Sequence, residues 1–213
     1  MKKRISIIMA ICLLLSLTAC GVNSGTNSNT EPSATQSQAE TPPSEPAAEP
    51  TEEAAKMLVV YFSATGNTKA VAEEIVRLAG ADLYEIVPAD PYTDEDLNYN
   101  NNDCRANQEM NDASARPAIG SEAIDVSSYD IVFVGYPIWW GTMPRIINTF
   151  LDTYDLSGKT VFPFCTSDSS SIIQSVTDIR AAEPDADVRD GLRASGANDS
   201  SIESWIADNG ISE

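Results

Sequence analysis

The sequence predicts an α/β domain in residues 57–213, built on a parallel sheet with helices on both faces. Two observations lead to this prediction. The apolar runs at residues 57–62 and 131–135 are continuous, which is typical of strands that are buried on both faces. Segments with apolar residues at helical spacing alternate with the predicted strands, and this alternation implies right-handed crossovers in a parallel sheet.

The first part of the domain predicts a strand, a helix and a second strand. Residues 57–62, Met-Leu-Val-Val-Tyr-Phe, suit a central strand, and residues 82–87 suit its neighbour. Between them, apolar residues recur on one helix face and a glycine typical of helix ends follows. These residues are Val71, Ile75, Leu78 and Gly80.

The middle of the domain predicts two more strands with a helix between them. Residues 131–135 form the third strand, and Pro144 suits the first position of the helix. One face of that helix is traced by Ile147, Phe150 or Leu151, and Tyr154. Residues 160–165 predict the fourth strand, although Pro163 is unfavourable inside a sheet because proline has no N–H to donate.

The last part predicts a helix, a short strand and a final helix. Apolar residues at 172, 173, 176 and 179 mark the first helix, and residues 187–192 contain the fifth strand. Ile202, Trp205 and Ile206 form the apolar face of the last helix. The connection from 88 to 129 is too long for a simple loop, so we expect a helix at 100–112 within it.

Charge and composition argue against several kinds of chemistry. The chain has 32 acidic and 13 basic residues, and the resulting net charge of -19 repels nucleic-acid phosphates. It has no histidine, which is the commonest metal ligand and the commonest general base near neutral pH. We therefore expect no nucleic-acid partner, no metal site and no catalytic side chain, and we expect a cofactor to supply the chemistry.

Residues 1–19 are typical of a bacterial lipoprotein signal peptide. Basic residues at 2–4 precede an apolar stretch at 5–17 that is too short to span a bilayer comfortably. Residues 17–20, Leu-Thr-Ala-Cys, resemble a lipobox, in which the cysteine is lipidated before cleavage. We therefore expect Cys20 to anchor the mature protein to the outer face of a bacterial membrane. The alternative is an ordinary signal peptide whose cleavage site happens to carry a cysteine.

Residues 20–56 predict a lipidated cysteine followed by a disordered linker. After Cys20, the stretch consists of small, polar and proline residues, and it has no aromatic residue. Its one sizeable apolar side chain is Val22. Such a composition cannot bury enough apolar surface to form a core. The linker would let the domain of residues 57–213 stand clear of the membrane.

A polar turn follows the first predicted strand. Residues 63–68, Ser-Ala-Thr-Gly-Asn-Thr, open the first helix and expose backbone N–H groups where hydroxyls and the helix dipole can hold an anion. The turn lacks the Gly-Lys-Ser/Thr ending of nucleotide-triphosphate loops and the glycine pattern of dinucleotide folds. It therefore suits a terminal monophosphate held by neutral donors. Taken alone, it is equally consistent with a turn whose Thr and Asn side chains cap the helix.

A second loop, after the third predicted strand, is unusually aromatic. It is residues 135–141, Gly-Tyr-Pro-Ile-Trp-Trp-Gly. Ligands of open α/β sheets bind beyond the carboxyl ends of the strands, so we expect this loop and the polar turn to converge on one site. The turn offers an anion cradle, and the loop offers flat apolar surfaces that suit an isoalloxazine ring. The alternative for Trp139 or Trp140 is an ordinary core residue.

These two loops resemble those of the flavodoxin-like family, in particular the branch with a Gly-Tyr-Pro-Ile-Trp-Trp-Gly loop. The resemblance covers residues 57–213 and implies a doubly wound five-stranded parallel sheet of order 2-1-3-4-5, with FMN as cofactor. It also implies which residues bind the FMN phosphate and which line the flavin ring. The phosphate-binding set is Ser63, Thr65, Gly66, Asn67 and Thr68, and the ring-lining set is Pro137, Ile138, Trp139, Trp140 and Gly141.

The resemblance further implies a third loop at the far edge of the ring, where Thr166, Ser167 and Asp168 would bind the cofactor. Related proteins usually have a glycine-rich run here, whereas this chain has Ser-Asp-Ser-Ser at 167–170. The added side chains and the charge of Asp168 bear on flavin affinity and on flavin potential.

A motif of the same branch is also present in the long connection. It consists of Arg105, Glu109 and the pair Arg116-Pro117. We expect these to be solvated charges.

Two cysteines, Cys104 and Cys165, belong to the mature domain. Outside the cytoplasm, such a pair can form a disulfide. Burial of Cys165 as a small apolar side chain is the ordinary alternative. The sequence does not decide between a disulfide and burial of Cys165.

Three functions fit these patterns. The favoured one is an FMN-binding redox protein that transfers electrons between extracytoplasmic or membrane-associated partners. The second is an FMN-dependent reductase of quinones or other small acceptors, which is disfavoured because no nicotinamide domain is visible. The third is a flavodoxin-fold binding module without flavin, for which Asp168 is the one feature in the sequence.

Overall fold

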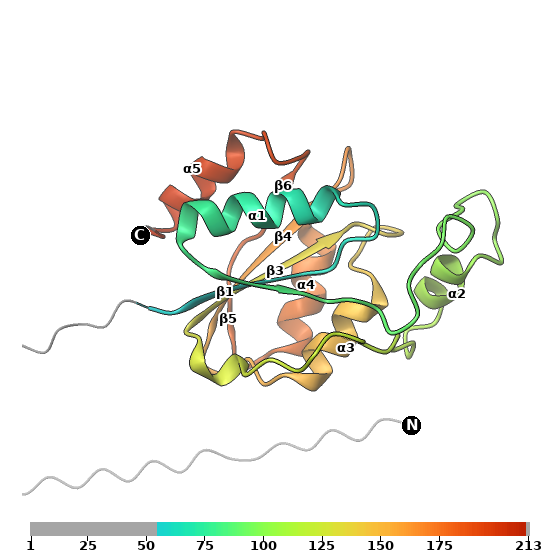
Figure 1. Cartoon of the computed structure of the whole chain (residues 1–213), viewed down its shortest axis with the longest axis horizontal. Helices are drawn as coiled ribbons and strands as arrows, with labels where there is room; N and C mark the ends of the chain where they lie inside the picture. The colour runs from blue at the N-terminus through green and yellow to red at the C-terminus, as the bar shows by residue number, and fades with distance from the viewer. Residues whose placement is uncertain (1–54, 212–213) are drawn as a thin grey trace, which may run out of the picture. The chain divides into compact units, whose positions relative to one another are not determined.

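The computed structural model describes residues 55–211, which form a parallel sheet with helices on both faces (Figure 1). The strands run in the order β2-β1-β3-β4-β5, every pair is parallel, and β6 also pairs with β4. This confirms the predicted sheet order 2-1-3-4-5. The strands are β1 Met57–Tyr61, β2 Asp82–Glu85, β3 Ile131–Pro137, β4 Thr160–Thr166, β5 Asp187–Val188 and β6 Leu192–Ala194.

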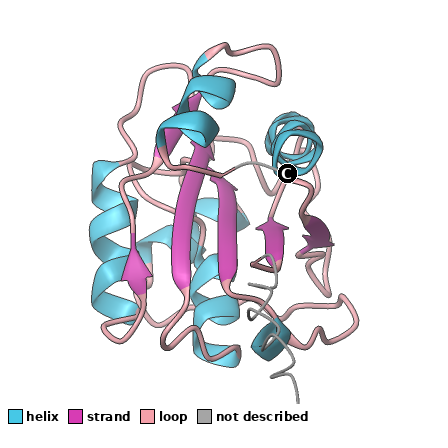
Figure 2. Cartoon of the chain, turned by 90° about the vertical axis from the view of Figure 1, so that its left-hand side faces the viewer, coloured by secondary structure: helices cyan, strands magenta, loops and turns pink. Residues whose placement is uncertain are grey.

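Helices cover both faces of the sheet (Figure 1), and Figure 2 shows the strands side by side in a view from one side of the domain. Helices α1 and α5 pack on one face, and α3 and α4 pack on the other. Helix α2 belongs to the long connection and lies to one side of the other helices in Figure 1. The helices are α1 Asn67–Ala79, α2 Arg105–Asn111, α3 Arg145–Thr153, α4 Ile173–Ala182 and α5 Ser201–Asp208. A short 3-10 helix, Val126–Ser128, precedes β3.

The central strands are buried on both faces because consecutive side chains of a strand enter opposite cores. In β1, Leu58 and Val60 pack on the α3 and α4 side, whereas Val59 packs on the α1 and α5 side. All three are fully buried. The continuous apolar run at the start of the domain therefore has the role that the sequence predicted.

The predicted fifth strand, residues 187–192, is divided into β5 and β6, and Pro163 of β4 lies opposite the break. Both short strands pair with β4, on either side of Pro163. The N–H of Arg189 donates to the carbonyl oxygen of Val161 at 2.9 Å. The odd-numbered residues of β4 therefore turn their backbone N–H and carbonyl groups toward β5 and β6. Pro163 has no N–H to offer there. Proline is thus tolerated in β4 because its neighbour is interrupted at the same point.

The helix predicted at residues 100–112 is shorter, because the residues before Arg105 form turns. The side chains of Asn98 and Asn101 accept hydrogen bonds from the N–H groups of Asn100 and Asp103 at 3.1 and 3.0 Å. Such local bonds compete with helix formation. Helix α2 begins only after Cys104, whose sulfur accepts a bond from the N–H of Asn107 at 3.4 Å.

The predicted signal peptide, Cys20 and nearly all of the linker lie outside the described residues. Lys56, the last residue assigned to the linker, already belongs to the folded part: its N–H donates to Asp130 Oδ2 at 2.9 Å. Within residues 55–211, no helix is both long and apolar enough to cross a membrane.

Candidate functional site

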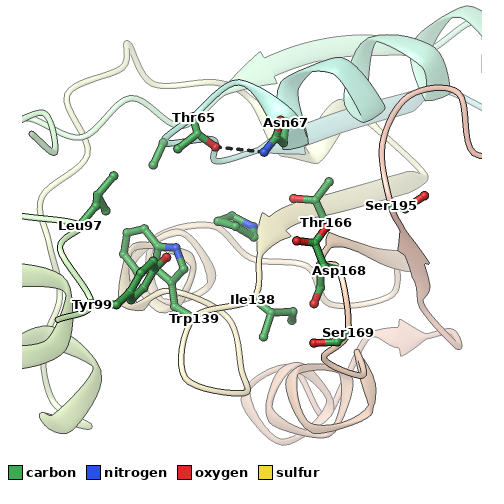
Figure 3. Close-up of a pocket in the computed structure, with 13 residues that line it drawn as sticks. Thr65, Asn67, Leu97, Tyr99, Ile138, Trp139, Thr166, Asp168, Ser169 and Ser195 are labelled. Carbon is green, nitrogen blue, oxygen red and sulfur yellow. Dashed lines mark hydrogen bonds between the residues drawn. The ribbon is translucent and has the colours of Figure 1, made fainter. Parts of the chain in front are cut away.

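A pocket of about 350 Å³ lies at the carboxyl ends of the strands (Figure 3), within the size range of small-molecule sites. The loops after β1, β3, β4 and β6 and the long connection all contribute to it. The predicted site residues that line it are Thr65, Asn67, Pro137, Ile138, Trp139, Thr166, Ser167 and Asp168. Residues that sequence reasoning missed also line it: Ala64, Leu97, Tyr99, Ser169 and Ser195. The structure thus brings the three predicted loops to one cavity.

The turn after β1 leaves the N-terminus of α1 available to a ligand. Gly66 has φ +87°, and no side chain caps the helix. The N–H groups of residues 67–69 therefore have no acceptor within the helix. The first turn carries no acidic side chain that would repel an anion. The alternative that Thr or Asn side chains cap this helix is wrong.

Gly66 also leaves open space above this N-terminus. A Cβ atom placed on Gly66 would meet no other atom within 4 Å. Ser63 does not line the pocket, but its Oγ accepts the N–H of Gly66 at 3.1 Å and so fixes the turn. The side-chain nitrogen of Asn67 donates to Thr65 Oγ1 at 3.4 Å, and Figure 3 shows this bond at the edge of the pocket. The arrangement is an anion cradle made of neutral donors.

Thr68 lies behind the cradle, outside the pocket lining. Its side chain is buried, and its hydroxyl lies 2.7 Å from that of Thr166 at the end of β4. Of the two hydroxyl hydrogens in this pair, one is used between the oxygens and the other remains for a further acceptor. Thr68 therefore connects the cradle with the third loop.

The aromatic loop supplies one wall of the pocket through Trp139. This residue is both a core residue and a lining residue, because its ring packs edge-on against Phe62 and Tyr92 at centroid distances of 5.6 and 5.1 Å. Trp139 is thus buried in the core and also lines the pocket, whereas its contact with a flavin ring stays a prediction.

The structure does not place Trp140 and Gly141 among the lining residues. They occupy the two central positions of a tight turn, with φ +47° and +86°, and Trp139 and Thr142 close it by N–H to carbonyl bonds of 2.9 and 3.1 Å. A turn of this type needs positive φ at both positions, which explains the glycine. Trp140 is 44% exposed, and its ring lies 5.1 Å from that of Tyr99.

The third loop, residues 166–170, contains no glycine, and hydrogen bonds from side chains fix its backbone. Nη1 of Arg193, in β6, donates to the carbonyl oxygens of Ser167 at 2.8 Å and Asp168 at 3.3 Å. The Ser167 hydroxyl accepts the N–H of Ser170 at 2.8 Å. The carboxylate of Asp168 is exposed at the pocket. Sequence reasoning missed Arg193, although its place near the carboxyl end of the last strand is a signal that could have found it.

The expectation of solvated charges at Arg105 and Glu109 is wrong. Arg105 Nε donates to Glu109 Oε1 at 2.7 Å, and the two side chains are only 23% and 14% exposed. Tyr92, which sequence reasoning did not single out, folds over this pair and shields it from water. Arg116 is more exposed and pairs with Asp152 at 2.6 Å.

The reactive side chains near the sheet are buried. Cys104 and Cys165 are both buried and free, so they do not form a disulfide in this structure. Burial raises the pKa of the Cys165 thiol to about 12. Burial also raises the pKa of Tyr136, whose hydroxyl donates to Ser175 Oγ at 3.0 Å. Residues 55–211 contain no cluster of three side chains that could hold a metal ion.

The fold and the site together define a class of protein. It is a doubly wound α/β domain with an anion cradle and an aromatic wall at one pocket, which suits a phosphorylated planar ligand. A family model described as flavodoxin matches residues 56–209. The chain belongs to the flavodoxin family.

Solved structures of similar proteins agree with this assignment. A Bacteroides eggerthii protein assigned as a flavoprotein is 46% identical, with 74% of this chain and 99% of that chain covered and a TM-score of 0.70. A Bacteroides uniformis protein assigned as a flavoprotein is 39% identical, with 73% and 99% covered and a TM-score of 0.70. A Lactobacillus acidophilus flavoprotein in complex with FMN is 25% identical, with 73% and 98% covered and a TM-score of 0.59. No curated protein is significantly similar to the chain.

Proposed function

We propose that the domain binds FMN in the pocket at the carboxyl ends of β1, β3 and β4, and that it carries electrons between extracytoplasmic partners. The observation that supports FMN most directly is that one pocket combines an uncapped helix N-terminus with the wall formed by Trp139. A phosphate suits the first feature, and a planar ring suits the second. The FMN-bound relative from Lactobacillus acidophilus supports the same cofactor.

The residues present fit this cofactor. The open space at Gly66 and the N–H groups of residues 67–69 would hold the phosphate, with Thr65 and Asn67 at its sides. Pro137, Ile138 and Trp139 would exclude water from the ring. Thr166, Ser167 and Asp168 would meet its polar edge. FMN, when bound, supplies the reversible uptake of one or two electrons.

The protein itself would therefore bind the cofactor, orient it and set its potential, without a nucleophile of its own. Charge near the ring is one means of setting the potential. Asp168 is the charged side chain of the third loop, and Arg193 is the charged side chain that donates to the backbone of that loop. The buried thiol of Cys165 takes no part, because it stays protonated.

The location is part of the proposal. The lipobox at residues 17–20 and the linker composition favour a domain that is anchored through Cys20 outside the cytoplasm. The donor and the acceptor would then be extracytoplasmic or membrane-associated.

The test starts with residues 21–213, the predicted mature chain without Cys20, purified without added flavin. We expect a yellow protein that releases FMN on denaturation. A colourless protein that takes up no FMN would instead indicate a binding module. Steady-state assays with quinones and defined electron donors then separate the two redox functions: rapid turnover of a small acceptor would favour a reductase over an electron carrier.

A further inference from the structure

Three side chains of the long connection contact one another behind the pocket. Arg105 Nε donates to Glu109 Oε1 at 2.7 Å, and the guanidinium carbon of Arg105 lies 4.2 Å from the centre of the Tyr92 ring. The Tyr92 hydroxyl donates to Glu109 Oε2. We refer to Tyr92, Arg105 and Glu109 as the clasp.

The clasp differs from the other ion pairs of the domain in its burial. Its two charged side chains are 23% and 14% exposed, whereas those of Arg77 and Glu74 on α1 are 64% and 29% exposed. Charged side chains that are this far removed from water need partners. Arg105 has the carboxylates of Glu109 and Asp90 and the Tyr92 ring, and Glu109 has Arg105 and the Tyr92 hydroxyl. A buried group of this kind constrains the position of the segments that carry it.

The clasp supports the aromatic wall of the pocket from behind. The Tyr92 ring meets the Trp139 ring edge-on, with centroids 5.1 Å apart and an interplanar angle of 83°. Trp139 itself lines the pocket, whereas Tyr92 does not. Arg105 and Glu109 hold the Tyr92 ring in place, so they act on the pocket wall without touching the cavity.

The clasp also closes the base of the loop formed by residues 93–104. Tyr92 precedes this loop and Arg105 follows it, and their contact joins its two ends. Arg105 Nη1 adds a bond to the carbonyl oxygen of Asp90 at 2.8 Å. The loop carries Leu97 and Tyr99, both of which line the pocket (Figure 3).

We propose that the clasp is a positioning device for the ring side of the flavin pocket. It holds Trp139 from behind and keeps Leu97 and Tyr99 at the cavity, and so it sets the affinity for the flavin ring. The phosphate cradle lies on α1 and shares no hydrogen bond with the clasp among the described residues. This inference rests on the proposed function, because it assumes that a flavin occupies the pocket.

The test compares FMN with riboflavin, which has the same ring and no phosphate. Arg105→Met and Glu109→Leu each remove one charged member of the clasp, and Tyr92→Phe removes only the hydroxyl. We expect the first two substitutions to weaken both ligands by the same factor, about fivefold to tenfold, which is the size expected for one lost partly buried interaction. Tyr92→Phe should weaken both ligands equally and by less, because its ring still supports Trp139.

The matched control is Asp152→Asn. It breaks the ion pair with Arg116, which lies in the same long connection but does not contact Trp139 or the loop of residues 93–104. We expect this variant to bind both ligands as the unmodified protein does. Titration calorimetry gives all dissociation constants.

A second measurement distinguishes positioning from general stability. In flavin-free protein, chymotrypsin should cut after Tyr99 faster in Glu109→Leu than in the unmodified chain, while cleavage after Trp205 in α5 stays the same. A loss of stability alone would accelerate both cleavages together. If Glu109→Leu does not fold, Arg105→Met decides the question by the same two measurements.

The outcomes separate this inference from the proposed function. If the unmodified protein binds neither ligand, the proposed function fails and the inference fails with it. If the unmodified protein binds both and the clasp variants match Asp152→Asn, only the inference is overturned. A loss restricted to FMN would also overturn it, because the clasp would then act on the phosphate side.

Discussion

The hydroxyl oxygens of Thr68 and Thr166 lie 2.7 Å apart, although 98 positions separate the two residues in the chain. Thr68 lies in the first turn of α1, and Thr166 ends β4. The bond therefore joins the phosphate cradle to the third loop, across the carboxyl ends of the central strands. A substitution at either residue tests how the two parts of the pocket depend on each other.

We expect Thr68→Ala to weaken FMN binding about tenfold and to change riboflavin binding little. Thr68 lies in the first turn of α1, so loss of its bond to Thr166 should displace the N–H groups that would hold the phosphate, and one hydrogen bond is worth roughly 0.5 to 1.5 kcal/mol. Thr68→Ser is the control and should retain most of the affinity. Equal losses for FMN and riboflavin in titration calorimetry would place the phosphate elsewhere.

Gly66→Ala should lower both stability and FMN affinity. An L-residue at φ +87° is strained by roughly 1 to 2 kcal/mol, and its Cβ would enter the open space of the cradle. Gly158→Ala is the matched control: its φ is +75°, it also has open space, and it lies far from the pocket, between α3 and β4. Both variants should melt at lower temperature. Only Gly66→Ala should also bind FMN more weakly, and if both variants bind it normally, the cradle is misplaced.

Asp168→Asn should raise the potential at which the bound flavin takes up its second electron. One charge about 10 Å away, at an effective dielectric constant near 20, changes the energy by about 1.7 kcal/mol, or about 70 mV for one electron. Arg193→Met should shift the potential in the opposite direction, and Arg193→Lys should retain it. Spectroelectrochemistry at two salt concentrations measures these shifts, which screening should reduce. An unchanged potential in Asp168→Asn would mean that this carboxylate lies away from the flavin.

The stability of the domain should fall as the pH rises through about 7, and Glu183 should cause part of this loss. Burial, followed by the nearby charges of Asp155 and Asp152, raises the pKa of Glu183 to about 7 from its ordinary value of 4.5. The folded state therefore binds this proton more tightly than the unfolded state does, and the stabilisation is complete only below the ordinary value. Glu183→Gln should remove this part of the pH dependence. Urea denaturation at about pH 5 and about pH 8 measures it; parallel curves for the two proteins would contradict the assignment.

Cys20 should carry the lipid of the mature protein. Labelled fatty acid should be incorporated into the unmodified chain and not into Cys20→Ala, which should remain as an unprocessed precursor or be released. Cys165→Ala is the control, because that thiol is buried. Absence of label from the unmodified chain would refute lipidation.

The sequence was sufficient to predict the parallel sheet because the buried strands are continuous apolar runs, and the pocket because the loops after β1 and β3 are unusual in composition. The strand order followed from the resemblance to the flavodoxin-like family. The break between β5 and β6 could not be predicted, since it depends on which edge of β4 the missing N–H of Pro163 faces. That orientation follows only from the pairing of the strands.

The clasp and the loop before it were missed for a different reason. Arg105 and Glu109 have the i, i+4 spacing of ordinary surface ion pairs, and nothing near them in the sequence indicates that Tyr92 covers them. Leu97 and Tyr99 lie in a segment whose turns are made by asparagine side chains, so no periodicity reveals which way they face. Side chains that reach a pocket from an irregular connection are found only once the connection is folded.

The chain enters the domain at the amino end of β1 (Figure 1). The pocket is lined by residues that follow the carboxyl end of the same strand. The five residues of β1 separate these two ends by about 17 Å. Any attachment made through residue 55, whether a natural tether or a surface used for immobilisation, holds the domain by the end remote from the cavity. In such an attachment, the point of attachment and the cavity lie at opposite ends of β1.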